Sequence, residues 1–185
     1  LTWTWYYRRV LQNPNYYNMT GATHHHLSDH LSALVEDTVS DLEESKCIAV
    51  EDDMDISPLN LGMVSAFYYV NYTTIELYAS SVSAKTRIKG LIEVLSASSE
   101  FALTTVRAGE ANILRRMARH LPQKMIETAD YEDATTKVLV LLQAHFTRVG
   151  LTTDLRGDLT IVLESCVKLI QALVDVIASE SWLKP

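Results

Sequence analysis

Four histidines near the start of the chain are the first side chains whose spacing could do chemistry: His24, His25, His26 and His30. His26 and His30 are four residues apart, so they share one face of a helix, and imidazole is a good zinc ligand. Neither a cysteine nor an acid on the same face completes a ligand set, and the competing interpretation is a solvated helix start. We therefore predict no metal site here.

A nucleophilic or nucleotide-binding centre is not predicted either. Ser28, Asp29 and His30 are consecutive, so their side chains point in different directions on a helix and cannot form a catalytic relay. Neither of the two glycine-rich loops that hold nucleotide phosphates occurs in the 185 residues. We predict no catalytic residue and no cofactor-binding residue in this chain.

The polar side chains of the last predicted helix, residues 158–180, are more informative. Asp158 is expected to cap this helix, and apolar residues occupy most of its circumference, which predicts a central position in a larger assembly. The remaining polar residues are spaced by four, three and four and share one face: Glu164, Lys168, Gln171 and Asp175. This polar stripe is expected to face solvent, a channel or a partner.

A run of aromatic residues has two interpretations: Phe67, Tyr68 and Tyr69, with Tyr72 close behind. Such rings can stack on the bases of a nucleic acid. Aromatic residues at consecutive positions of a short helix are more often packed at a domain junction, and we favour packing.

The net charge of −7 is unevenly distributed along the chain. Residues 27–55 contain ten acids and one lysine, whereas residues 85–124 contain eight basic residues and three acids. This asymmetry indicates two surfaces with different partners, the second facing a polyanion. The alternative is that both runs are solvated helix faces that keep the protein soluble.

Composition places the chain among ordinary folded proteins, with 48% hydrophobic and 21% charged residues. No segment approaches the roughly 20 apolar residues that a bilayer requires, so no membrane partner is predicted. The two cysteines, Cys47 and Cys166, are too far apart for a metal motif and indicate reduced thiols in a cytosolic or nuclear protein. The first residues show no signal peptide, and the chain is expected to be a piece of a longer protein.

The first 70 residues predict the element order of a winged helix. A helix over residues 2–12 ends before Pro14, and a longer helix capped by Thr23 has an acidic face and an apolar stripe. Two short strands, 47–50 and 56–61, form a hairpin that would be the wing, and a helix over 63–69 follows.

The remainder is predicted to be helical. Thr73 or Thr74 caps a short helix, Ser83 caps a helix over 84–96, and Pro122 closes a helix over 111–121 that carries exposed arginines. Gly150 ends a helix over 134–149, and residues 123–133 form a loop. The predicted fold class is mostly α: a winged helix followed by an α-helical bundle with a long central helix.

Several stretches of the chain resemble the second helicase cassette of the large spliceosomal RNA helicases. The strongest are Asn-Pro-Asn-Tyr-Tyr (13–17), His-Leu-Ser-Asp-His-Leu-Ser (26–32), Asp-Leu-Glu (41–43), Ser-Lys-Cys-Ile (45–48), Pro-Leu-Asn-Leu-Gly-Met (58–63) and Asn-Tyr-Thr-Thr-Ile-Glu (71–76). Residues 141–145 and 181–183 look similar to the same family, and the likeness is weaker over 101–133. The helical unit is also similar to one in an endoplasmic-reticulum translocation J-protein, in which no winged helix precedes it.

The resemblance implies a winged-helix domain over residues 1–70, truncated at its N-terminus, and a helical bundle (ratchet) domain over 71–185, truncated at its C-terminus. It implies a non-catalytic segment of a nuclear, ATP-dependent RNA helicase that unwinds small nuclear RNA duplexes to activate the spliceosome. ATP and Mg²⁺ would bind the upstream motor domains, outside this chain. The implied partners are small nuclear RNA, other splicing proteins and the rest of the cassette.

The resemblance also marks candidate sites. The last helix looks like the ratchet helix that touches single-stranded nucleic acid in related helicases, which points to Lys168, Gln171 and Glu164, with Arg115 and Arg119 on the basic helix. Archaeal DNA helicases similar to this unit carry an aromatic residue near the position of Lys168.

A lysine at this position supports backbone contact but not base stacking, and Glu164 and Asp175 would repel phosphate. The alternative function is therefore a protein-interaction platform with little RNA contact. Its recruiting surface would be the acidic face of the helix capped by Thr23, at Asp37, Asp41 and Glu44.

Overall fold

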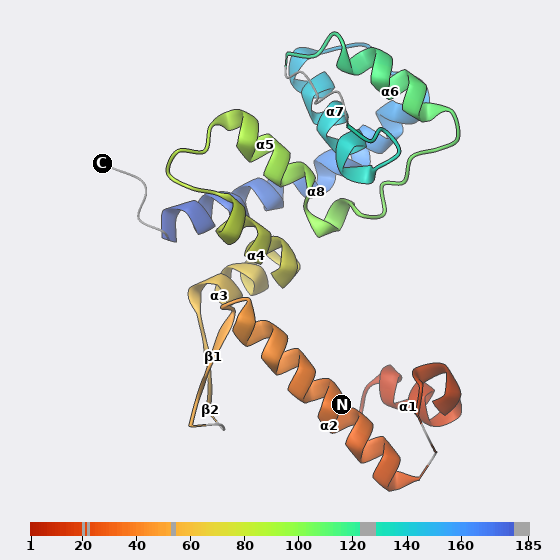
Figure 1. Ribbon diagram of the computed structural model, residues 1–185, viewed down its shortest axis with the longest axis vertical. Helices are drawn as coiled ribbons and strands as arrows, with labels where there is room; N and C mark the ends of the chain where they lie inside the picture. The colour runs from red at the N-terminus through yellow and green to blue at the C-terminus, as the bar shows by residue number, and fades with distance from the viewer. Residues whose placement is uncertain (20, 22, 53–54, 123–128, 180–185) are drawn as a thin grey trace.

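The computed structural model describes residues 1–19, 21, 23–52, 55–122 and 129–179. The described chain is mostly helical, with one two-stranded hairpin and a long last helix, which confirms the predicted fold class. Figure 1 shows the long second helix joining a small unit at the start of the chain to the hairpin, with the other helices beyond the hairpin. No helix in these residues is both long and apolar enough to cross a membrane.

The first unit is built on α1 (Trp5–Gln12), η1 (Pro14–Tyr17) and the start of α2 (His24–Glu44). The predicted cap of α2 is confirmed, because Thr23 accepts a hydrogen bond from the backbone N–H of His26, and Thr4, which was not predicted as a cap, accepts one from the backbone N–H of Tyr7 in α1. A small core of Val10, Met19 and Leu27 holds the unit together, with tyrosines packed around it. The chain continues after α1 as a short 3₁₀ helix that includes Pro14.

The predicted hairpin is confirmed, with a shorter second strand. Strand β1 (Ile48–Glu51) pairs antiparallel with β2 (Asp55–Pro58), and Val50 lies opposite Ile56. Part of the predicted turn, residues 53–54, lies outside the described residues. The second strand stops at Pro58 because the backbone then enters α3 (Asn60–Tyr68), three residues earlier than the predicted helix.

Helices α3, α4 (Tyr72–Ser81) and α5 (Ile88–Ser96) pack with η2 (Ser99–Phe101) and α8 (Thr153–Ser179) in the larger hydrophobic cluster. Two predicted caps are wrong here. Asn71 precedes α4, and the Thr74 hydroxyl is buried, donating instead to Glu100. Ser83 does not cap α5 because its backbone N–H bonds the Thr86 hydroxyl in a turn before that helix.

Helices α6 (Glu110–Ala118) and α7 (Ala134–Thr147) pack against the first turns of α8 in a second cluster. Gly150 was predicted to end this helix, but that prediction is wrong. Helix α7 ends at Thr147, and the next residue, Arg148, is in the left-handed region with φ 55°. Residues 123–128 of the predicted loop lie outside the described residues, as do Glu180 at the predicted end of the last helix and residues 181–183 of the resemblance.

The long helix α8 touches both clusters, so its predicted central position is confirmed. It begins at Thr153, five residues before Asp158, and Asp158 is therefore not its cap. Its buried face is continuous from Leu155 to Val176. The exposed face is wider than predicted, because several apolar side chains flank the polar stripe in solvent: Ile161, Val167, Ile170 and Val174.

Candidate nucleic-acid interface

The predicted polar stripe lies on the surface of α8. Glu164, Gln171 and Asp175 are exposed and Lys168 is half-buried, all on the side of the helix away from the core. Two of them contact the C-terminal end of α3: Lys168 Nζ donates to the carbonyl oxygen of Tyr69 at 3.3 Å, and Tyr68 donates to Asp175 Oδ2 at 2.7 Å. The stripe therefore faces solvent beside α3.

These two contacts leave the stripe with both a cation that can bind an anion and carboxylates that oppose it. The hydrogen bond to Asp175, with burial and the carboxylate charge, raises the pKa of Tyr68, so the tyrosine stays a donor. An ammonium group has three N–H donors and Lys168 uses one on a carbonyl, which leaves it able to bind an anion. Glu164, one turn away, supplies the opposing charge.

The aromatic run behaves differently from our prediction. Phe67 is 80% exposed and Tyr69 is 89% exposed, so packing is wrong for both residues, while Tyr68 and Tyr72 are half-buried. Tyr69 is exposed because its left-handed conformation (φ 53°) ends α3, and Val70 enters the core in its place. Two rings are thus exposed at the end of α3, where the Tyr69 carbonyl oxygen accepts from Lys168, and single-stranded nucleic acid could stack on them.

The structure does not bring Arg115 and Arg119 to the stripe. Both are exposed, Arg115 on α6 and Arg119 directly after it, and the Arg115 guanidinium lies 5.3 Å from the ring centre of Tyr131. Helix α6 packs where α8 begins, around Leu155 and Leu159. Lys168 is nine residues beyond Leu159, about 14 Å along the helix axis. The two basic surfaces are therefore separate.

The predicted acidic face of α2 is also exposed. Asp37, Asp41 and Glu44 recur at four and three residues and are all exposed, so they form one acidic row. Two apolar side chains of α2, Leu34 and Val35, are also exposed, and Leu34, seven residues before Asp41, shares the face of the acidic row. Figure 1 shows the middle of α2 standing clear of the helices that follow the hairpin.

The histidines of α2 have other partners. His26 Nδ1 lies 2.8 Å from the Thr23 hydroxyl, His30 Nε2 lies 2.9 Å from the Tyr6 hydroxyl, and His25 pairs with Asp29. Within the described ranges, no group of three or more histidines, cysteines or acids could hold a metal ion.

The structure also contains a buried ion cluster that was not predicted from the sequence. Lys137 is 0% exposed and donates to Glu110 Oε2 at 2.7 Å and to the carbonyl oxygen of Thr105 at 2.9 Å, and its Nζ lies 2.7 Å from Asp158 Oδ2. Arg107 forms a two-bond pair with the same Asp158, at 2.6 and 2.7 Å. One available signal was a lysine directly before the apolar run 138–142, because a lysine is rarely buried unless it is paired.

The cluster holds both carboxylates ionised. Burial alone would raise the pKa of Glu110, but hydrogen bonds from Lys137 and the backbone N–H of Arg107 outweigh it, and its pKa lies below the ordinary value. The pKa of Asp158 is also lowered, first by the hydrogen bonds of Arg107 and then, against burial, by those of Lys137. The cluster ties α6, α7 and α8 together at one point.

Two family models match the chain: a winged helix-turn-helix domain over residues 1–52 and the Sec63 Brl domain over residues 58–185. The U5 small nuclear ribonucleoprotein 200 kDa helicase of Homo sapiens is 52% identical over 185 residues, and that of Drosophila melanogaster is 53% identical over 189. The DExH-box ATP-dependent RNA helicase DExH12 of Arabidopsis thaliana is 52% identical over 183 residues.

These matches cover 99% to 100% of the chain, which confirms the resemblance to the large spliceosomal RNA helicases. The chain spans only 9% of the length of the human and fly relatives and 8% of the plant relative.

Proposed function

Because the chain belongs to the Sec63 Brl domain family, we propose that it is a non-catalytic segment of an ATP-dependent RNA helicase that unwinds small nuclear RNA duplexes in spliceosome activation. The similarity to U5 small nuclear ribonucleoprotein helicases along the whole chain supports this proposal. The parent protein works in the nucleus with other splicing proteins. ATP and Mg²⁺ bind its motor domains, which are separate from these 185 residues.

The role of the segment within that helicase is to flank the RNA path with α8. The observation that carries this role is the contact of the half-buried Lys168 with the carbonyl oxygen of Tyr69, at the end of α3 where the rings of Phe67 and Tyr69 are exposed. A cation that contacts phosphate next to rings that stack on bases is the combination that single-stranded nucleic acid requires. The aromatic residue that archaeal relatives carry on the helix itself is here supplied by the neighbouring helix.

Replacing Lys168 by glutamate tests this role. We expect Lys168→Glu to weaken binding of single-stranded RNA about fivefold to tenfold and to reduce its salt dependence, because a phosphate contact becomes a repulsion. Fluorescence anisotropy of a labelled oligonucleotide, measured with the full chain at several salt concentrations, gives both quantities. The matched control is Arg8→Glu on α1, an exposed residue with the same change of charge. Equal affinities for the two variants would contradict an RNA path along α8.

The exposed acidic row on α2 favours a second function, a protein-interaction platform that recruits splicing factors or regulators. Replacing Asp37, Asp41 and Glu44 by lysine should abolish capture of such a partner, since six units of charge change on one helix face. The measurement is a pull-down of splicing proteins by the full chain, with RNA affinity as the control. A triple variant that still captures the same proteins would rule this surface out.

A further inference from the structure

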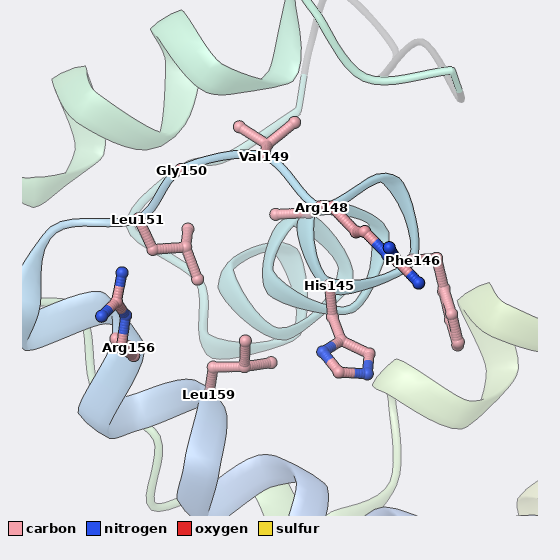
Figure 2. A pocket seen from close by; sticks show the side chains of 9 residues that line it. His145, Phe146, Arg148, Val149, Gly150, Leu151, Arg156 and Leu159 are labelled. Atoms are coloured by element: carbon pink, nitrogen blue, oxygen red, sulfur yellow. The ribbon is translucent and has the colours of Figure 1, made fainter.

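The turn between α7 and α8 encloses a pocket of about 570 Å³ that the proposed function does not use. Its walls come from the last residues of α7, the connecting turn and the first turns of α8 (Figure 2). The left-handed conformation of Arg148 turns the chain away from α7, and Leu159 lines the floor where the two helices meet. The pocket is open to solvent because His145, Phe146, Arg148 and Arg156 are all exposed.

The ionisable side chains that line this pocket are all basic: His145, Arg148 and Arg156. Neither arginine forms an ion pair with any other residue that the structure describes. Asp154 and Asp158, the nearest acids in sequence to Arg156, are each two residues away and so project from a different side of α8, and Asp158 is paired with Arg107 and Lys137. An unpaired pair of guanidinium groups in a concave surface without a lining acid fits an anionic ligand.

The arrangement of the cations indicates the kind of anion. Figure 2 shows Arg156 on one side of the pocket, and Arg148 and Phe146 on the other. Cations that are spread across a pocket suit a chain with repeated charges better than a single small ion. Phe146 is 60% exposed, and its ring lies 5.7 Å from that of His145. An exposed ring beside separated cations is the arrangement that binds phosphates and unstacked bases together.

Further basic side chains lie on and just after α6, which packs in the same hydrophobic cluster as the helices that form the pocket. The apolar side of α6 packs against Ala144, Leu155 and Leu159, close to the α7–α8 turn. Its polar side exposes three arginines, Arg115, Arg116 and Arg119. A negatively charged strand that leaves the pocket toward α6 therefore meets further cations, which also raise its rate of encounter.

We infer that this pocket binds a segment of single-stranded nucleic acid, with phosphates on Arg148 and Arg156 and a base against Phe146. An acidic protein segment would use the arginines but would gain little from the exposed ring. Arg156 lies twelve residues before Lys168, about 18 Å along α8. The pocket is thus a separate contact from the one proposed at the polar stripe.

The test measures fluorescence anisotropy of labelled oligouridylate and oligodeoxythymidylate of about 12 nucleotides, a length that such sites cover, with the full chain. We expect Arg156→Gln to weaken binding about fivefold to tenfold and to reduce the slope of log K against log salt by about 0.7. Phe146→Leu should weaken binding about tenfold and leave that slope unchanged, because it removes stacking and not charge. Arg8→Gln is the matched control for lost charge, and the thermal midpoint of each variant checks its folding.

The two probes separate RNA from DNA as the source of the strand, and binding of either supports the pocket. Three results would overturn it: no binding of either probe, equal affinities of Arg156→Gln and Arg8→Gln, or tight binding of polyglutamate that Phe146→Leu leaves unchanged, which would assign an acidic protein ligand. Failure here is distinguishable from failure of the α8 path. If Arg156→Gln weakens binding and Lys168→Glu does not, the proposed pocket is supported and the RNA path along α8 is contradicted. The reverse result contradicts the pocket alone.

Discussion

Lys137→Met is expected to lower the free energy of unfolding by about 3 to 5 kcal/mol, because it removes the central cation of a buried ion cluster. Lys137 is 0% exposed and lies 2.7 Å from a carboxylate oxygen of both Glu110 and Asp158. Without Lys137, the carboxylates of Glu110 and Asp158 have little contact with water. Their one remaining cationic partner among the described residues is Arg107, which is exposed. Methionine fills the volume of the lost side chain, so the loss reports charge rather than a cavity.

Denaturation in urea, followed by circular dichroism, measures this loss. The control is Lys89→Met on α5, whose ammonium is exposed and lies 4.0 Å from Glu93, so removal of its charge should cost under about 1 kcal/mol. A second comparison adds Glu110→Gln to Lys137→Met, since removing the uncompensated charge should recover part of the loss. Equal stabilities of Lys137→Met and Lys89→Met would show that the buried cluster contributes nothing specific.

Acid gives a second readout of the same cluster. The pKa values of Glu110 and Asp158 are lower in the folded than in the unfolded protein. Their contribution is therefore fully present above the unfolded values, near pH 4, and is lost as pH falls through the folded ones. The wild-type chain should lose stability over this range, and Lys137→Met should lose less, because part of the favourable interaction is already absent.

The features that could be predicted from the sequence are those that residues close together in the chain determine. Thr23 caps α2 because an N-cap needs only a hydroxyl three residues from an N–H, and the hairpin follows from two short β-prone runs around a charged turn. The stripe on α8 followed from helical spacing alone. Each of these features depends on residues close together in the chain.

The predictions that were wrong concern residues whose positions depend on contacts with residues far away in the sequence. Asp158 fits the preferences of a helix cap, yet it pairs with Arg107 and Lys137, 51 and 21 residues away in the sequence. Tyr69 fits a packed aromatic residue, and only the left-handed turn at the end of α3 shows that its ring is exposed. Arg115 was expected to flank the same nucleic acid as Lys168, although α6 packs against the first turns of α8, away from Lys168. Periodicity assigns a residue to a face but does not say which element covers that face.

The junction between α2 and α3 depends on the absence of one side chain. Cys47 is buried, its backbone N–H donates to Leu42 in the last turn of α2, and its carbonyl oxygen accepts from Leu59 just before α3. Gly62, in the first turn of α3, lies directly against that carbonyl group. A Cβ at Gly62 would overlap the carbonyl oxygen of Cys47 and approach its carbonyl carbon to 3.0 Å. Both groups belong to the backbone, so neither can rotate away.

Gly62→Ala should therefore lower the free energy of unfolding by about 2 to 3 kcal/mol, because α3 must shift away from the strand that follows Cys47. Gly157→Ala is the matched control. Gly157 lies within α8, no atom stands within 4 Å of a Cβ placed there, and alanine in a helix is favoured over glycine by about 1 kcal/mol. In urea denaturation, the same glycine-to-alanine change should therefore lower the free energy of unfolding at position 62 and raise it at position 157.

Hydrogen exchange of the β1 amides should accelerate in Gly62→Ala alone, since the hairpin is attached to α3 through this contact. Unchanged stability of Gly62→Ala would mean that the junction relaxes freely and does not fix the hairpin against the helices that follow it.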